Sequence, residues 1–465
     1  MIDVILVNPP NSFPADDTVI QKRKGYSLYP PAGIMYVAAA LENNGLKVQI
    51  IDAVASGDSV GGIFESIALN NVPMVGISAT TAQLRGSLQL ATKIKERFDD
   101  KVSVGIGGPH VSADPAFIER FSAFDFALIG EGEKTFPELV RAAREGEQVK
   151  GVYYGERIED LDSIVFPNRH LINSDDYYIE PCGKHFATVI TIRGCPFNCS
   201  YCSNPVGARH ARFRSPKNVV DEIQHYIREF GIKHILFTDD TFTLNRKHAA
   251  GICEDLISRN IKILWSCETR AGLVDRELLE LMYRAGCREI SFGVESGSEE
   301  IRQKVLNKKV SNTALITAFT ECHRRGIDAH AFCILGVPGE TKENMLETLD
   351  FTKKIKPDVL GLHLTVLFPD SALYKQAIEE GKIPEDIWDK YARGEIEDQP
   401  IYIPDGFSRQ TMETMQKSIY LRYYYRPAYL ARRFLKDLTH FSRLKHDLGL
   451  GIALLFSPRT KTGRP

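Results

Sequence analysis

The sequence has no long apolar run and no stretch typical of a secretion signal. No segment reaches the roughly 18 consecutive apolar residues that a membrane-spanning helix needs. The first residues, MIDVILVNPP, show no basic segment followed by an apolar core. The chain is also nearly neutral, with a formal net charge of −2, so no overall attraction to nucleic acid or to an anionic membrane is expected. We therefore predict a cytoplasmic protein that does not bind nucleic acid.

Cysteine is scarce outside one short stretch. The chain has nine cysteines in 465 residues, none before residue 182 and none after residue 333. Six are scattered singly, which is typical of small buried side chains in a reducing compartment, so disulfides are not expected. The other three, Cys195, Cys199 and Cys202, lie within eight residues in the stretch RGCPFNCSYC. Only this group has the spacing of metal ligands.

What the sequence does contain is a regular alternation of short apolar runs with helix-length segments. Its length predicts two or three domains. Residues 1–150 hold five apolar runs separated by helical segments, which predicts a parallel sheet with helices on both faces. After a connecting segment at 151–187, six strand–helix units within 188–375 predict an open or partial β/α barrel. Residues 376–465 are predicted to be helical, and the fold class is α/β.

The three cysteines form the pattern C-x3-C-x2-C directly after the first strand of the predicted barrel. A closed structural zinc site needs a fourth ligand, so one interpretation is a zinc site completed by a distant Cys or His. The other is a [4Fe–4S] cluster, which normally takes four protein ligands. With only three thiolates, one iron would stay open to a molecule that carries an amine and a carboxylate.

The cysteine pattern, with an aromatic residue before the last cysteine, resembles the radical S-adenosylmethionine (SAM) superfamily. Four further motifs follow the later strands in the same order: FTDDTFTLN, SCETRAG, GVESGSEEIRQKVLNK and LGVPGET. The resemblance implies that Cys195, Cys199 and Cys202 hold the cluster. It also implies a set of residues around the cluster and SAM: Tyr201, Asp239, Asp240, Glu268, Arg270, Glu295, Ser296, Gly336 and Gly339. The loop after the sixth strand, VLFPDSALY, departs from the Pro-Gly-Thr of relatives, so no role is assigned to it.

The first 150 residues resemble the Rossmann-like cobalamin-binding domain of B12-dependent radical SAM enzymes. This group includes the anaerobic magnesium-protoporphyrin ester cyclase and the hopanoid-modifying enzymes, and LVNPP, GIS, GGPHVSADP and IGEGEKTFPEL carry the likeness. It implies that Ser78, Thr80, Gly107 and Gly108 admit the nucleotide tail of the corrinoid. The Asp-x-His-x-x-Gly element is absent, so cobalamin is expected base-off without a histidine ligand. The alternative is a Rossmann-like domain that has lost cobalamin.

Four further polar residues of this domain have structural interpretations, and for His110 and Asp52 a contact with the cofactor is the alternative. His110, after the fourth strand, either touches the cofactor or makes a hydrogen bond within its loop. Asp52, at the end of the second strand, either caps the next segment or meets the cofactor. Glu131 and Glu133 are placed at a helix start, where the helix dipole stabilises acids.

Together the two resemblances imply a [4Fe–4S] cluster, SAM and cobalamin as cofactors. Reductive cleavage of SAM would give a 5′-deoxyadenosyl radical, which removes hydrogen from an unactivated carbon, and methylcobalamin would donate the methyl group. The alternative is a non-methylating outcome, namely cyclisation, ring contraction or oxygen insertion. A corrinoid-carrying relative without catalysis is a third interpretation, against which the complete cysteine set argues. The implied partners are a small-molecule substrate and an external electron donor such as flavodoxin or ferredoxin.

The tail that begins YLRYYYRP is basic and rich in tyrosine. It either rests on a membrane surface or covers an apolar substrate, such as a lipid or tetrapyrrole, or it forms a helical cap with a solvated basic face. Tyr177, Tyr178, His330 and His363 are candidates for facing the substrate. Ordinary packing roles are the alternative for the two histidines.

Overall fold

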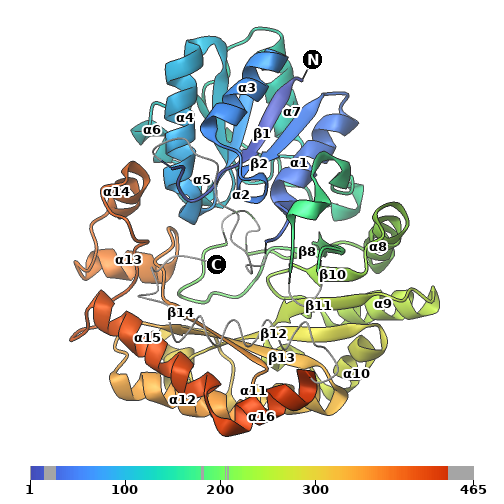
Figure 1. Ribbon diagram of the computed structural model, residues 1–465, viewed down its shortest axis with the longest axis vertical. Coiled ribbons are helices and arrows are strands. Elements are labelled where there is room, and N and C mark those ends of the chain that lie inside the picture. Colours follow the sequence, from blue (N-terminus) through green and yellow to red (C-terminus); the bar gives the residue numbers. More distant parts are fainter. Residues whose placement is uncertain (1, 15–27, 180–182, 205, 207–208, 438–465) are drawn as a thin grey trace.

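The computed structural model describes residues 2–14, 28–179, 183–204, 206 and 209–437. They form two six-stranded parallel sheets, one above the other in Figure 1, with helices packed around them. Within these ranges every helix is too short or too polar to cross a lipid bilayer.

The N-terminal sheet has the strand order β2-β1-β3-β4-β5-β6, and all its neighbouring strands are parallel. Its strands are nearly continuous apolar runs, as expected when both faces of a parallel sheet are buried. The strands are β1 (Val4–Asn8), β2 (Val48–Asp52), β3 (Met74–Ser78), β4 (Ser103–Gly107), β5 (Phe126–Ile129) and β6 (Gly151–Tyr154).

Helices cover both faces of this sheet and form two separate cores. Helices α1 and α7 pack on one face, and α3 and α4 pack on the other. The sheet is therefore doubly wound, as predicted. The helices are α1 (Ala32–Asn43), α2 (Ala53–Ser56), α3 (Val60–Asn70), α4 (Leu84–Phe98), α5 (Pro109–Ala113), α6 (Phe117–Arg120) and α7 (Thr135–Arg144).

The second sheet has the order β14-β13-β12-β11-β10-β7, again all parallel. This open arrangement of six strands confirms the predicted partial barrel. One face carries a single large core, and burial alternates along β13, so that every second side chain faces the open inner side. The strands are β7 (Phe186–Val189), β10 (His234–Phe237), β11 (Leu264–Thr269), β12 (Cys287–Glu295), β13 (Asp328–Leu335) and β14 (Val359–Leu364).

The outer helices of the barrel begin and end where local sequence signals place them. In the first of them, Ser215 caps the helix through a hydrogen bond from the backbone N of Asn218, Pro216 opens it, and Gly231 ends it with φ 61°. The helices are α8 (Pro216–Phe230), α9 (Arg246–Ser258), α10 (Arg276–Arg284), α11 (Asn312–Arg325) and α12 (Lys342–Ile355). Figure 1 shows this row on the outer side of the sheet.

The segment predicted as a linker is more structured than expected. The N-terminal sheet continues past residue 150, since β6 pairs with β5 and belongs to this sheet. A two-stranded ribbon of β8 (Ile192–Arg193) and β9 (Arg212–Phe213) then follows the first barrel strand. The domain boundaries at 150 and 188 stay predictions, but sheet pairing places residues 151–154 with the first half.

The helices after residue 371 do not form a separate layer. Helix α14 packs against α4 of the N-terminal half. Its Asp389 makes a bidentate ion pair with Arg120 of α6 at 2.6 and 3.1 Å. Its Trp388 and Tyr391 belong to the core of the N-terminal half. This region therefore links the two halves. Its helices are α13 (Ala372–Glu379), α14 (Ile387–Arg393), α15 (Arg409–Tyr424) and α16 (Pro427–Asp437).

The tyrosines of α15 close the open edge of the barrel sheet. Tyr420 OH accepts from the backbone N of Leu362 at 2.7 Å and donates to its carbonyl at 2.9 Å. One helical turn on, Tyr424 makes the same pair of bonds with Leu360, at 2.8 and 2.9 Å. The exposed groups of edge strand β14 are thereby satisfied, so the predicted helical cap is correct for this part of the tail. Residues 438–465 lie outside the described part of the chain.

Candidate active site

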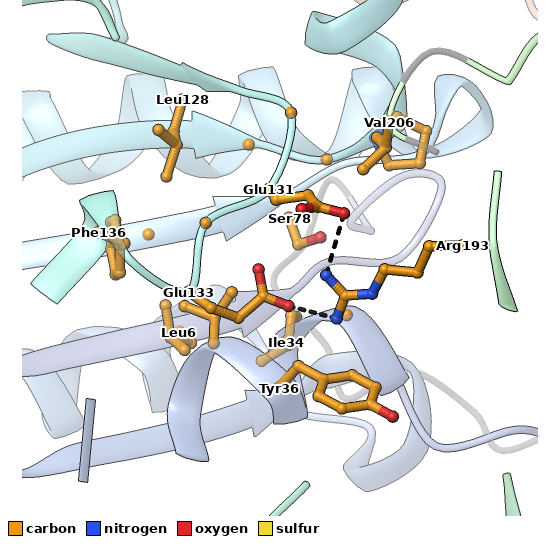
Figure 2. Close-up of a pocket in the computed structure, with 18 of the residues that line it drawn as sticks. Leu6, Ile34, Tyr36, Ser78, Leu128, Glu131, Glu133, Phe136, Arg193 and Val206 are labelled. Carbon is orange, nitrogen blue, oxygen red and sulfur yellow. Dashed lines mark hydrogen bonds and ion pairs between the residues drawn. The ribbon is translucent and has the colours of Figure 1, made fainter. Parts of the chain in front are cut away.

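A cavity of about 340 Å³ lies between the two sheets (Figure 2). The N-terminal half contributes residues at the ends of β3, β4 and β5 and in α1. The second half contributes Ile190, Ile192, Arg193, Gly194, Val206, Thr238 and Asp240. The carboxyl ends of both sheets therefore border one cavity. Because open α/β sheets bind ligands at this end of their strands, the cavity is the candidate active site.

Glycines shape the apolar floor of this cavity. An added Cβ at Gly105 would lie 2.0 Å from the Phe126 ring, so the glycine lets this ring lie flat against β4. At Gly33 an added Cβ would meet nothing within 4 Å, because this residue borders open space. Leu6 and Phe136 complete the apolar wall (Figure 2).

Three of the four residues predicted to admit a corrinoid tail line the cavity, namely Ser78, Gly107 and Gly108. Gly108 has φ 100°, a conformation that side chains disfavour. Thr80 is not among the lining residues. Its hydroxyl donates to the Gln83 side chain at 2.8 Å in a capping box before α4, so the structure gives it a capping role.

His110 lies in the core and away from the cavity. Its side chain is fully buried, Nδ1 lies 3.3 Å from Thr81 Oγ1, and the ring meets Phe117 edge to face at 5.0 Å. Burial lowers its pKa to about 4. Of its two interpretations, the structure supports a hydrogen-bonding role. None of the described residues that line the cavity is a histidine.

Asp52 caps helix α2. Its Oδ1 accepts from the backbone N of Val54 at 3.2 Å and of Ala55 at 3.3 Å. Its Oδ2 accepts from Tyr177 OH at 2.9 Å. Tyr177 is therefore buried against the N-terminal half.

Glu131 and Glu133 form ion pairs with arginines of the second half of the chain. Glu131 accepts from both terminal nitrogens of Arg212, at 2.6 and 2.9 Å, and Glu133 accepts from Arg193 at 2.5 Å. Burial acts to raise the pKa of Glu131, but the hydrogen bonds from Arg212 and Ile158 and the charge of Arg193 lower it overall. Sequence reasoning missed both arginines. The signal was two acids and an arginine in otherwise apolar or glycine-rich stretches, IGEGE and TIRGCP.

The cysteine loop is attached to the ends of neighbouring barrel strands. Arg270, which follows β11, donates to Cys199 Sγ at 3.3 Å, and its guanidinium lies 3.8 Å from the Phe197 ring centre. Cys195 Sγ lies 4.0 Å from Thr241 Oγ1, which follows β10. Arg270, which the resemblance placed around the cluster and SAM, thus contacts the cysteine loop.

The three thiols are free and separate from one another. Among the described His, Cys, Asp and Glu side chains, no three are placed to hold a single metal ion. A four-iron cluster is a larger body, in which each thiolate binds its own iron. Burial, followed by the charges of Cys199 and Asp240, raises the pKa of Cys202 to about 11, so metal binding there would release a proton.

Tyr201 and Glu295 connect the cysteine loop to β12. Glu295 Oε1 accepts from Tyr201 OH at 2.8 Å and from Lys308 Nζ at 2.5 Å, and the carboxylate is only 6% exposed. Glu295 has φ 62° and follows a break in the strand register, which turns its side chain toward the loop. Tyr201 and Glu295 were both predicted to lie around the cluster and SAM. In the structure they lie beside the cysteine loop and bind each other.

The two adjacent aspartates after β10 have different environments. Asp239 is 1% exposed and accepts from the backbone N of Thr191 at 2.6 Å and of Ile192 at 2.8 Å. Burial raises its pKa to about 7, and it fixes the chain just before the cysteine loop. Asp240 lines the cavity. Glu268 projects into the barrel mouth, where burial and then the charge of Asp240 raise its pKa.

The remaining predicted residues divide between packing positions and the open surface. Ser296 is 1% exposed, and its Oγ lies 3.4 Å from Thr348 Oγ1 in α12. Gly336 has φ 86° and donates its backbone N to Glu340 at 2.6 Å. Gly339 has φ 69°, and an added Cβ there would meet nothing within 4 Å.

The two barrel histidines lie on the inner side of the second sheet. His330 Nδ1 is 3.3 Å from Glu289 Oε1 of the neighbouring strand β12. The ring of His363 lies 6.2 Å from the Phe332 ring, and burial lowers its pKa. Both stay candidates for facing a substrate.

Two family models match the chain in the order of its two sheets. The B12 binding domain matches residues 20–140, and the radical SAM superfamily matches residues 189–352. An uncharacterized methyltransferase of Pyrococcus horikoshii is 30% identical over 448 residues, which cover 93% of this chain and 94% of that protein.

Two further comparisons agree with this assignment. The anaerobic magnesium-protoporphyrin IX monomethyl ester cyclase of Rubrivivax gelatinosus is 29% identical over 431 residues, covering 88% of this chain and 76% of that protein. Among solved structures, the radical SAM methyltransferase TsrM of Kitasatospora setae, determined with cobalamin and a [4Fe–4S] cluster bound, has the same fold. Its TM-score is 0.63 at 20% identity, with 82% of this chain and 75% of that chain covered.

The residues of the site fit the cofactors of this family. Cobalamin suits a cavity with an apolar, glycine-shaped floor at the ends of parallel strands, and a cluster suits three free thiols beside an arginine. The cofactors are a [4Fe–4S] cluster, SAM and cobalamin, and they explain why two parallel sheets turn the same ends toward one cavity. The chain belongs to the B12-dependent radical SAM enzymes.

Proposed function

We propose that this protein is a methyltransferase that transfers a methyl group to an unactivated carbon of a small molecule. The observation that carries the proposal is the shared cavity, which brings the cobalamin-type half and the cysteine loop to one place. The similarity to a methyltransferase over nearly the whole of both chains supports the same reaction.

In this proposal Cys195, Cys199 and Cys202 hold the cluster. Arg270 stabilises it by donating to Cys199 Sγ, because a cationic donor favours the thiolate. The Tyr201–Glu295–Lys308 network fixes the loop against β12. These side chains set the position of the metal site and exclude water from it.

The acids at the barrel mouth are proposed to receive the ammonium group of SAM. Burial raises the pKa of Asp240 and of Glu268, and the charge of Asp240 raises the pKa of Glu268 further, so a cation beside them would be stabilised. Gly339 leaves open space for an adenine ring. Asp239, by contrast, is committed to Thr191 and Ile192 and is proposed to position the chain.

The N-terminal cavity is proposed to hold cobalamin through Ser78, Gly107 and Gly108 without a histidine ligand. When bound, the cluster with SAM supplies a carbon-centred radical, and cobalamin supplies the methyl group. The chain's own contribution is to hold these groups in line and to keep the space between them apolar.

The test is incubation of anaerobically reconstituted protein with reductant, candidate substrates and SAM labelled in its methyl group. Label in a product, together with 5′-deoxyadenosine, is the expected result. An altered but unlabelled product would support the second candidate, a radical cyclisation or ring rearrangement. That candidate is favoured by the 29% identity to the porphyrin ester cyclase over 88% of this chain.

The substrate and partners are proposed only by class. A reducing protein such as flavodoxin or ferredoxin would supply electrons. An apolar substrate, lipid or tetrapyrrole, is suggested by the basic tyrosine-rich tail, but Tyr420 and Tyr424 already bind the sheet edge. The predicted membrane contact would have to come from the rest of the tail, namely α16, where Leu430 and Phe434 are exposed, or residues 438–465, which lie outside the described part of the chain.

A further inference from the structure

The base of the cysteine loop carries two arginines that face each other. Arg193 on β8 and Arg212 on β9 are direct partners in the antiparallel ribbon from which the loop emerges. Their side chains are 14% and 6% exposed. Like charges directly opposite each other destabilise such a pair, and burial increases the cost. The ribbon therefore depends on negative charge from elsewhere.

That negative charge comes from the cobalamin-type half. Glu131 lies between the two arginines, with Arg212 at 2.6 Å and Arg193 at 3.2 Å, while Glu133 lies 2.5 Å from Arg193. Both acids are themselves buried, at 5% and 8% exposure. Buried charge pairs that lose one partner are strongly destabilised. The base of the loop and the turn after β5 are thus held together.

Arg193 also borders the cavity, as do both of its acidic partners (Figure 2). Its guanidinium lies 5.0 Å from the ring centre of Tyr36, another lining residue. A ligand in the cavity would therefore contact both sides of the ion-pair group. Arg212 shares Glu131 but is not among the lining residues.

Only one residue separates Arg193 from the first cysteine. Gly194, with φ 95°, is the sole link between Arg193 and Cys195. On the other side of Arg193, the amides of Thr191 and Ile192 are fixed by Asp239. A movement of Arg193 is therefore transmitted to Cys195 across a single residue.

We propose that Arg193 is a positioning residue that couples the two cofactor sites, so that each cofactor binds more tightly when the other is present. The inference rests on the proposed cobalamin and cluster sites and deepens them. Filling the cavity restrains Glu131, Glu133 and Arg193 together, and the restrained arginine holds Cys195 in its ligating position. Because binding free energies are reciprocal, the coupling must act equally in both directions.

The experiment measures the Kd of hydroxocobalamin with and without the reconstituted cluster, by equilibrium dialysis under anaerobic conditions. In the wild type, the cluster is expected to lower the Kd by about fivefold or more, the lower end of typical coupling between sites. In Arg193→Gln the ratio of the two Kd values should fall to about one. If Arg193 has only a structural role, the Kd of hydroxocobalamin should rise both with and without the cluster. The ratio of the two Kd values should then stay as in the wild type.

Two further variants keep the test decisive. Glu133→Gln removes the nearer of the two charges that pair with Arg193 and should reduce the ratio even if Arg193→Gln does not fold. Arg157→Gln removes a surface pair with Glu159 at 2.8 Å, with 38% and 73% of the side chains exposed, and should keep the wild-type ratio.

A wild-type ratio of one, or an unchanged ratio in both Arg193→Gln and Glu133→Gln, would overturn the coupling. These outcomes are separate from the methyl-labelling result, since coupling without label transfer would contradict the proposed function alone. Label transfer without coupling would contradict this inference alone.

Discussion

The two sheets have the same number of strands and the same parallel pairing, yet they build their parts of the site differently. The N-terminal sheet is covered on both faces, and β5 is buried at every position. Glycines at the strand ends leave the space in which a ligand can bind. The barrel sheet is covered on one face only, and β13 alternates between buried and partly exposed residues. Its inner face can therefore carry charged and polar groups, such as Glu268 and His330.

Because of this difference, the two halves suit different kinds of ligand. A doubly covered sheet with an apolar floor has few polar groups to offer and suits a large flat ligand. A singly covered sheet supplies carboxylates, an arginine and thiols to a small charged cofactor. The ion pairs of Glu131 and Glu133 join the two environments, and α14 joins them a second time.

The largest expected effect is loss of the [4Fe–4S] cluster from the barrel half. Replacing Cys195, Cys199 and Cys202 together with alanine should reduce bound iron from about four atoms per chain to background. Cobalamin should still bind, though more weakly than with the cluster in place, because most residues that line its cavity belong to the N-terminal half. The matched control is Cys322→Ala, a buried cysteine of α11 away from the site. Iron analysis and the visible spectrum measure both cofactors, and four retained irons in the triple variant would disprove the cluster site.

The converse change should act on the binding of cobalamin. Gly33→Leu places a side chain in the cavity from α1 without backbone strain. Cobalamin affinity should fall by about tenfold or more, since overpacking costs about 1–3 kcal/mol. The iron content should not change.

The control for this cavity variant is Gly33→Ala, which should be neutral or stabilise the helix by up to about 1 kcal/mol. Equilibrium dialysis against hydroxocobalamin measures the affinities. Wild-type affinity in Gly33→Leu would mean that cobalamin does not occupy this cavity.

The barrel edge should be more sensitive to tyrosine changes than the N-terminal edge. The double variant Tyr420→Phe/Tyr424→Phe leaves the backbone amides of Leu360 and Leu362 without their partners. The free energy of unfolding should fall by about 2–6 kcal/mol, at about 1–3 kcal/mol per unsatisfied group. Tyr154→Phe, 71% exposed in edge strand β6, should cost less than about 0.5 kcal/mol. Urea unfolding measures these free energies. Equal losses in the double variant and in Tyr154→Phe would show that the edge hydrogen bonds do not stabilise the barrel sheet.

A further effect concerns pH, where the two halves should behave alike. His110 and His248 are each buried, and burial lowers both pKa values to about 4. The unfolded chain then binds more protons between pH 6.5 and pH 4. Stability is therefore fully present above about pH 6.5 and is lost as the pH falls toward 4.

Each histidine should contribute about 2 kcal/mol to the loss of stability between pH 7.5 and pH 5. His110→Gln or His248→Gln should make the dependence of unfolding free energy on pH less steep, as measured by urea unfolding at a series of pH values. An unchanged slope in both variants would show that these side chains titrate normally.

Regular patterns in the sequence predicted most of the fold. The twelve strands of the two large sheets include eleven that were expected from apolar runs, because parallel buried strands need continuous apolar residues. Strand β6 was missed, since GVYY is exposed at the edge of the sheet and carries no strong signal. The cysteine spacing identified the metal site because its ligands are close in the chain.

Contacts between distant segments could not be predicted in the same way. Asp52 acts as a cap, Thr80 belongs to a capping box, and Ser296 packs on α12. Each is a polar residue at a strand end, and only the neighbouring element decides whether its oxygen faces a ligand or the chain.

The sequence by itself determined the two parallel sheets, the ligand spacing of the three cysteines and the family, because these depend on residues that are near one another in the chain. Tertiary structure alone decided that Arg193 and Arg212 meet Glu131 and Glu133 beside the cavity. It also decided that tyrosines of α15 close the barrel edge. The physical reason is that a buried charge or an unpaired strand edge needs a partner, but any distant segment with suitable chemistry can supply it.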